Sequence, residues 1–431
     1  MSGKYEMFNP GEYKEWEKDE VELRLRIFRG EEKAAPPPGF DAGEGDDFSW
    51  FMKPHAYTEE EILAYNKLWN PRDPLYTDIE YARAHGHPSV PAYPGFDAMA
   101  PIMAVPPFPK NIASWFYYTN DGTDIRYTRN VYAGDFLTDA NETTMFEDRT
   151  KPGSEVRTFA MGGEKDRVDQ GGAPVYHVAG NVRECWRKYT DDTPPPTFSE
   201  NMAYWTTYFP EGHVTTDEDY ERMARIWAQE KINGDEVPYW DDIPVGFELP
   251  QTCTDGPITY MHMMYYHNIG NMSIPKREYL ADPETRKLTF RDRFGSFLDE
   301  TALHYGGRNI VGSRAVWYND TGARLIARTL TNFVGTKGRV SRFSWRFFPF
   351  FEELRQGPLC ADMFDKVPGM EGRDCDRHGS DGDTCIGRAV VTGKYVNEAG
   401  EGCLEVMLWG EDLEGNIVQG CPSEIVLPKR S

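Results

Sequence analysis

Basic residues are scarce in this 431-residue chain: 47 Lys and Arg stand against 70 Asp and Glu, giving a formal net charge of −23. Nucleic-acid binders present a basic face to the phosphate backbone, so this balance argues against nucleic acid as a partner. A small anionic ligand is still compatible with it, because a local group of arginines can bind phosphate within an acidic protein. The alternative interpretation is that the charge serves solubility alone.

Cysteines are few, and long apolar runs are missing. The seven cysteines are scattered and form no CxxC, which excludes a disulfide framework or a zinc knuckle of the usual spacing and indicates a reducing compartment. No stretch approaches the roughly 18 apolar residues of a membrane span, and the charged N-terminal region has no signal-peptide core. We therefore expect a cytoplasmic protein without membrane contacts.

The composition and length predict two domains. Aromatic residues make up 14% and hydrophobic residues 39% of the chain, which is enough to form hydrophobic cores. The chain is too long to fold around one compact core. A helix, loop, helix and strand order recurs in the two halves, which predicts tandem related units of α+β class. The expected parts are an irregular arm (1–50), a first domain (51–190), a linker (191–236) and a second domain (237–431).

Local patterns place the elements of these parts. Thr58 precedes three glutamates and is expected to cap a helix. A short apolar run with helical spacing covers 94–105, a polar helix is expected within 215–234, and a long helix over 321–335 is expected to end at Gly335. Strands are expected within 125–150, 154–163, 174–189, 339–350, 384–396, 403–415 and 416–428.

Asp299 and His304 carry the candidate chemistry. They lie five residues apart in FLDETALHYGG, an irregular stretch ahead of the long helix. Adding water to an activated double bond needs one group that takes a proton from water and one that delivers a proton to carbon, which a carboxylate and an imidazole can do together. The helix opens around Asp320, Thr321 and Gly322, and its free N–H groups can stabilise a developing enolate.

This segment resembles the MaoC-like hydratase family of hot-dog fold, which carries D-x-N-P-(L/I)-H followed by a glycine and a helix. Asp299-Glu300-Thr301-Ala302-Leu303-His304 keeps the Asp, the Leu and the His, but Thr-Ala replaces Asn-Pro. The stretch YWDDIPVGFELP and the ending of the chain are also similar to the larger two-domain members. The resemblance implies a double hot-dog, with Asp299 and His304 as the acid/base pair and the N–H of Gly322 as the donor to the thioester carbonyl.

The first half resembles the same template in degenerate form. In Asn70-Pro71-Arg72-Asp73-Pro74-Leu75-Tyr76, Tyr76 stands at the position of the His and Pro71 at that of the Asp. Neither can serve as the family's pair does, so the resemblance implies a first domain without chemistry that supplies room for the acyl chain.

Substrate contacts and metal sites follow from weaker patterns. Arg314, Tyr318 and Arg324 are predicted substrate-binding residues, with ion pairing as the alternative for the arginines that surround the site, Arg308, Arg328 and the basic residues of KGRVSRFSWR among them. Cys375, His378 and Cys385 could suggest a metal, but no fourth ligand is evident, and an ordinary surface insertion is expected within 352–382. His262 and His267 are expected to pack or line a pocket.

The predicted activity is reversible hydration or dehydration of an enoyl- or 3-hydroxyacyl-CoA-type thioester. Neither a metal nor a redox cofactor is expected, coenzyme A enters as part of the substrate, and the expected assembly is a homodimer. Two alternatives stay open. A hot-dog thioesterase would not need the paired His, and a non-catalytic protein that binds an acyl or aromatic ligand would account for the many aromatic residues.

Overall fold

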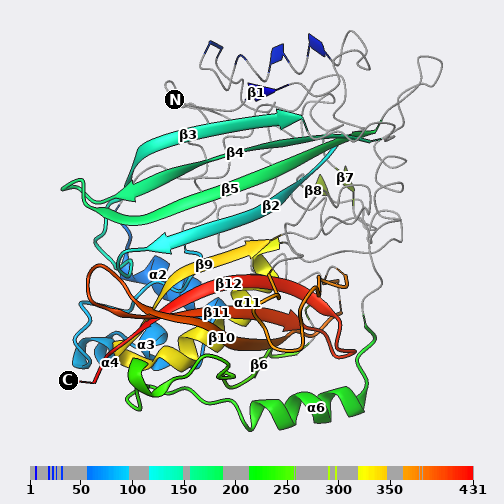
Figure 1. Ribbon diagram of the computed structural model, residues 1–431. Helices are drawn as coiled ribbons and strands as arrows, with labels where there is room; N and C mark the ends of the chain where they lie inside the picture. Colours follow the sequence, from blue (N-terminus) through cyan, green and yellow to red (C-terminus); the bar gives the residue numbers. More distant parts are fainter. Residues whose placement is uncertain are drawn as a thin grey trace.

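A single large sheet runs through the computed structural model (Figure 1). Its strand order is β1-β3-β4-β5-β2-β9-β12-β11-β10-β6. The structure describes residues 56–96, 116–148, 156–187, 213–256, 258, 319–346, 363–377, 379–380 and 382–430, with short pieces at 5–6, 18–19, 22–23, 26, 31–32, 290–291 and 297–298.

The first half of the sheet is an antiparallel array that follows the predicted strands. The expected run from Ile125 to Thr150 holds a turn between two strands, and the first of them begins earlier, at Phe116. A short N-terminal strand pairs parallel to β3 at the outer edge. The strands are β1 (Tyr5–Glu6), β2 (Phe116–Tyr127), β3 (Thr138–Asp148), β4 (Val156–Val168) and β5 (Pro174–Arg187).

The second half repeats this array with the predicted strands. They pair antiparallel in the order β9-β12-β11-β10, and the edge is completed by β6. The strands are β6 (Thr252–Cys253), β9 (Arg339–Arg346), β10 (Ile386–Val396), β11 (Gly402–Glu411) and β12 (Ile417–Leu427), and β7 (Phe290–Arg291) and β8 (Phe297–Leu298) form a separate pair. The two halves meet where β2 pairs antiparallel with β9.

Helix α11 (Asn319–Val334) packs across the strands of the second half, as predicted. It comes so close to β10 that a Cβ on Gly387 would lie 2.5 Å from the hydroxyl oxygen of Thr329. The helix ends at Gly335, whose φ of +65° suits glycine, and a short turn, η5 (Gly335–Lys337), leads into β9.

Short helices before β2 cover the other side of α11. Thr58 caps α2 with a capping box, since its hydroxyl accepts from the N–H of Glu61 and the Glu61 carboxylate accepts from the N–H of Thr58. These helices are α2 (Glu59–Trp69), α3 (Pro74–Thr77) and α4 (Ile79–Ala84). The expected polar helix is α6 (Asp217–Trp227), which lies along the β6 edge ahead of η3 (Trp240–Asp242).

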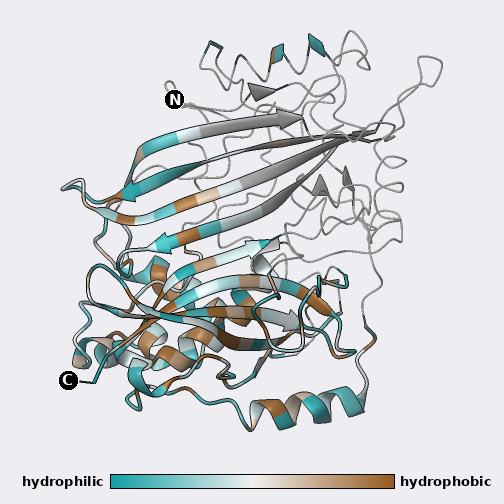
Figure 2. Ribbon diagram, in the orientation of Figure 1, coloured by the Kyte–Doolittle hydropathy of each residue, from teal (hydrophilic) through white to brown (hydrophobic). Residues whose placement is uncertain are grey.

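The fold is α+β, and the predicted double hot-dog is confirmed by its two antiparallel arrays and the long helix enclosed by the second. Apolar side chains of β9–β12 and α11 dominate the core, and Figure 2 shows brown stretches on these elements, whereas the coloured parts of β3 and β4 are largely teal. Most of the helix expected over 94–105 lies outside the described residues.

The described part of the 352–382 insertion lies on the face of the sheet opposite α11. Phe364 and Val367 pack with Met407 and Trp409 of β11, whose neighbours Val406 and Leu408 face the main core. The expectation of an ordinary surface segment is wrong for Cys375, which is 3% exposed within this second cluster, and Cys385 is 1% exposed. Cys375 belongs to this second cluster and Cys385 to the main core, so apolar side chains bury both thiols.

Candidate functional site

The first turn of α11 holds the candidate site. Gly322 is the fourth residue of the helix and is buried, directly after the opening residues whose N–H groups have no partners within the helix. Thr321 and Ala323 beside it are also buried. These N–H groups and the helix dipole favour negative charge at this end, so a carbonyl oxygen that gains charge during a reaction would be stabilised there.

Arg324 follows in the same turn and is held by aromatic rings of the first half. Its guanidinium carbon lies 5.5 Å from the centroid of the Tyr65 ring and 5.4 Å from that of Trp69. Its Nη2 donates to the carbonyl of Gly95 over 3.2 Å, and its own carbonyl accepts from the hydroxyl of Tyr93 over 2.8 Å. At 8% exposure, the cation is stabilised by ring faces and carbonyl oxygens rather than by water.

Arg328, one turn further on, is 2% exposed and links three segments of the chain. It donates to the carbonyl of Trp69 over 2.9 Å and pairs with Asp255 over 3.3 Å. Arg72 joins the same group through Asp255 at 2.8 Å and Glu230 at 3.0 Å. Burial raises the pKa of the Glu230 carboxyl, although the N–H of Cys253 and the charge of Arg72 oppose the shift.

Further polar contacts extend this junction along α11 and into the turn that follows it. The amide of Asn70 donates to Thr331 over 3.1 Å and to Asn332 over 2.9 Å. Further on, Nε2 of His87 lies 2.9 Å from the carbonyl oxygen of Thr336. Because buried polar groups need partners, each of these pairs fixes α11 against residues 66–95 of the first half.

The predicted site residues divide between described and undescribed parts of the chain. Gly322 and Arg324 lie together in the first turns of α11. Asp299, His304, Arg314 and Tyr318 lie outside the described residues, and so do His262, His267 and His378. The acid/base pair, the donor role of Gly322 and the three substrate contacts therefore stay predictions.

In the first half, the degenerate motif forms helix caps and packing contacts. Asp73 accepts from the N–H of Leu75 over 3.0 Å and caps α3, and Asp78 caps α4. Tyr76 packs edge-on against Tyr93, with 5.7 Å between ring centroids. Burial raises the pKa of Asp73 to about 6 and that of the Tyr76 phenol well above its usual value, so Tyr76 stays neutral.

Two of the three arginines of β9 pair with carboxylates. Arg342 pairs with Asp124 of β2 over 2.7 Å, and Arg339 pairs with Glu401 over 2.7 Å. Arg342 alternates with the core residue Phe343, so its side chain points away from α11. Among the described residues, no cluster of three or more His, Cys, Asp or Glu could hold a metal ion, and no helix is long and apolar enough to cross a membrane.

No protein-family model matches the chain, and no curated protein matches it significantly. Solved structures do resemble it. A MaoC-like dehydratase has a TM-score of 0.47 at 16% identity, covering 87% of this chain and 96% of its own. A putative MaoC domain protein dehydratase from Chloroflexus aurantiacus has a TM-score of 0.45 at 16% identity, and the match covers 88% of this chain and 94% of that protein. A double hot-dog protein from Mycobacterium tuberculosis has a TM-score of 0.44 at 14% identity, and the match again covers 88% of this chain and 94% of that protein.

Sequence reasoning missed the buried polar face of α11. Arg324, Arg328, Thr331 and Asn332 recur at helical spacing on one side of the helix, and all four are buried. A polar stripe on a helix is usually its solvated face. Only the many apolar residues on the other sides of α11 indicated that the whole helix is enclosed.

Proposed function

We propose that this chain is a hydratase or dehydratase of the MaoC-like family that acts on an acyl-CoA-type thioester. The observation that supports it is a double hot-dog sheet around a buried helix, with Gly322 in its first turn and the Asp-x(4)-His motif just ahead of it.

In this proposal Asp299 and His304 hold the reacting water between them. In the hydration direction Asp299 accepts a proton from water, whose oxygen attacks the β-carbon of the enoyl thioester. His304 shares the water and shuttles the proton that the α-carbon receives. In dehydration the same groups exchange roles, as microscopic reversibility requires. The net reaction adds or removes one water and needs no oxidant or reductant.

The thioester carbonyl accepts a hydrogen bond from the first turn of α11. Charge develops on its oxygen as the enolate forms, and the N–H of Gly322 and the helix dipole stabilise it there. Arg324 and Arg328 keep this turn in place by tying α11 to Gly95, Trp69 and Asp255. Because aromatic rings and a carbonyl oxygen enclose Arg324, its role in this proposal is to hold the first turn of α11 in position.

The finer assignments follow the resemblance of the motif. Arg314 and Tyr318 bind the coenzyme A part of the substrate, and the hydroxyl product has (R) configuration. The first domain takes up the acyl chain without performing chemistry, and the protein works as a cytoplasmic homodimer.

The deciding experiment offers a panel of enoyl-CoA and 3-hydroxyacyl-CoA thioesters to the purified protein. Hydration bleaches the conjugated absorbance and adds the mass of one water, and chiral separation then assigns the product. Release of free coenzyme A without the added water would identify a thioesterase instead. Binding without any chemical change, across the whole panel, would identify a non-catalytic acyl-binding protein.

A further inference from the structure

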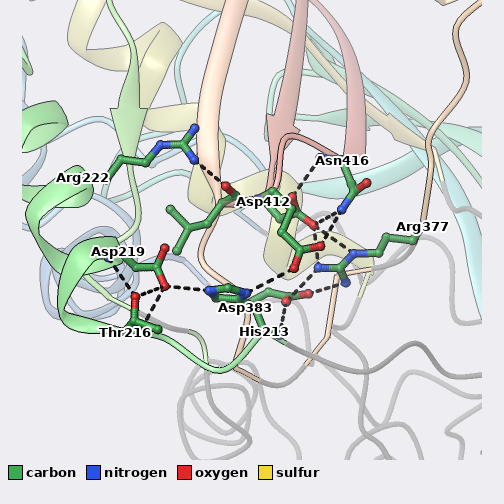
Figure 3. Close-up of polar contacts among 10 residues, drawn as sticks. His213, Thr216, Asp219, Arg222, Arg377, Asp383, Asp412 and Asn416 are labelled. Atoms are coloured by element: carbon green, nitrogen blue, oxygen red, sulfur yellow. Dashed lines mark hydrogen bonds and ion pairs between the residues drawn. The ribbon is translucent and has the colours of Figure 1, made fainter.

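His213 lies between two carboxylates that come from different elements (Figure 3). Its Nε2 is 2.7 Å from Oδ2 of Asp219 in the first turn of α6, and its Nδ1 is 3.4 Å from Oε1 of Glu414 in the turn between β11 and β12. Its backbone N–H donates to Asp383, just ahead of β10, over 2.8 Å. One residue therefore connects three segments.

The sheet side of this contact is rigid. Arg377 donates to Asp383 and to Asp412, each over 2.6 Å, and both carboxylates are fully buried. Asp412 also accepts from the backbone N–H groups of Glu414 and Asn416, which fixes the turn that presents the Glu414 side chain. The turn that carries Glu414 is therefore fixed in place opposite His213.

The helix side is held less firmly. Met223 is the one fully buried residue of α6, in a small cluster with Cys253, Ile386 and Leu413. Arg222 adds a hydrogen bond to the carbonyl of Leu413. Ile226 and Trp227, both partly buried, pack against the same cluster. With one residue of α6 fully buried, the docking of the helix on the β6 edge also depends on its polar contacts.

We propose that His213 is a pH-operated latch: its protonated ring holds the amino end of α6 against the β11–β12 turn, and loss of the proton releases it. An imidazolium donates from both nitrogens and so serves Asp219 and Glu414 together. A neutral ring has a single N–H, so one carboxylate loses its hydrogen bond and its opposite charge. Because His213 connects three segments of the chain, the loss of this hydrogen bond changes contacts between segments that are distant in the sequence.

The direction with pH follows from the charges around the ring. The hydrogen bond with Asp219 raises the pKa of His213, the charges of Asp219 and Glu414 add to this, and burial opposes it. Because the folded pKa lies above the unfolded one, the latch is fully closed below about pH 6.5 and opens as pH rises through the folded value. The same bond lowers the pKa of Asp219 to about 2, so acid opens the latch only well below neutral pH.

The other charged groups near the ring do not reverse this direction. Among the described residues they are Asp383 and Asp412, which share the one cation of Arg377, and Arg222, whose guanidinium is directed to the Leu413 carbonyl. The negative charge that remains favours the protonated ring as well. Beyond α6 the chain continues to Glu230, which accepts from the N–H of Cys253 and pairs with Arg72. Release of α6 would therefore loosen the β6 edge strand that Glu230 contacts.

The test follows hydrogen exchange of α6 amides and the His213 ring by NMR between pH 5.5 and 9. After correction for intrinsic exchange, we expect α6 protection to fall at least about tenfold across the His213 titration while α11 protection stays unchanged. His213→Gln should remove this pH step. Asp219→Asn should move its midpoint down toward the ordinary value of about 6.5.

His85→Gln is the matched control, because His85 also pairs with a carboxylate, Asp235, at 2.6 Å but lies outside the latch. It should keep the step. Should His213→Gln lower α11 protection as well, Glu414→Gln replaces it, and a lower midpoint then supports the latch. A pH-independent α6 in the natural chain, or an unchanged step in His213→Gln or Glu414→Gln, overturns the proposal. These measurements need no substrate, so the result stands apart from the proposed activity.

Discussion

The two stretches that resemble the family motif lie in different surroundings in the two halves. In the first half, Asp73 and Asp78 cap short helices and Tyr76 is packed under Tyr93. In the second half, the motif precedes a long buried helix whose first turn has N–H groups to offer. Within the first-half motif, Tyr76 is buried and keeps its proton, and Asp73 is occupied as a helix cap. The described residues of this motif therefore serve the fold.

The largest expected effect separates the halves by activity. Asp299→Asn or His304→Ala should lower the hydration rate by about 100- to 10,000-fold, because a general acid or base is lost. Tyr76→Phe, at the matching position of the first half, should leave the rate unchanged because the neutral phenol performs no step. The measurement is turnover of an enoyl-CoA thioester, with circular dichroism to check folding. Near-normal rates in Asp299→Asn or His304→Ala would remove the proposed site.

The junction between the halves gives the next largest effect. Arg328→Met should reduce the free energy of unfolding by about 3–5 kcal/mol, because the Trp69 carbonyl loses its buried donor and Asp255 loses its cation. Arg72→Met removes a half-exposed member of the same network and should cost less than about 1 kcal/mol. Urea unfolding measures both. Equal costs would show that burial of Arg328 does not set the strength of the junction.

A buried carboxyl should make the first half sensitive to pH. Burial raises the pKa of Asp73 from 3.8 to about 6, so its stabilising proton is fully bound below about pH 4 and is lost as pH rises through 6. The ionised group then costs about 3 kcal/mol. Asp73→Asn keeps a capping side chain and should flatten the stability profile between pH 4 and 8. The control Asp78→Asn, at the exposed cap of α4, should leave the pH dependence of stability unchanged. A stability that does not vary with pH in the natural chain would contradict the prediction.

The smallest effect compares two capping boxes. Thr58→Ala should cost about 1 kcal/mol of global stability, because α2 contributes the buried residues Ile62 and Trp69 to the main core. Thr216→Ala should instead raise hydrogen exchange in α6 and leave global stability nearly unchanged, because α6 buries little. Denaturant unfolding and hydrogen exchange together distinguish the outcomes. A global loss in Thr216→Ala would mean that α6 belongs to the main cooperative unit.

The sequence predicted what depends on local periodicity. Strands β9–β12, helix α11 and its end at Gly335 have strong patterns, and Thr58 carries its own capping signal. The surroundings of Arg324 and Arg328 were beyond reach, because their partners lie in residues 65–95 and 253–255 and nothing local to α11 encodes them. Likewise, the motif identified Tyr76 as unsuitable for catalysis, but the burial of Asp73 depends on packing that only the fold supplies.

The β2–β9 pairing also has a consequence for the order of folding. Gly122–Arg126 pair with Arg342–Arg346, more than two hundred residues later in the chain, with Asp124 and Arg342 218 positions apart. Contacts this distant close slowly, and during synthesis β2 is made long before β9 exists. Until then β2 is an open edge that could pair with another chain. Asp124 and Arg126 place opposite charges on that edge and so protect it from aggregation, until Arg342 arrives and takes Asp124 as its partner.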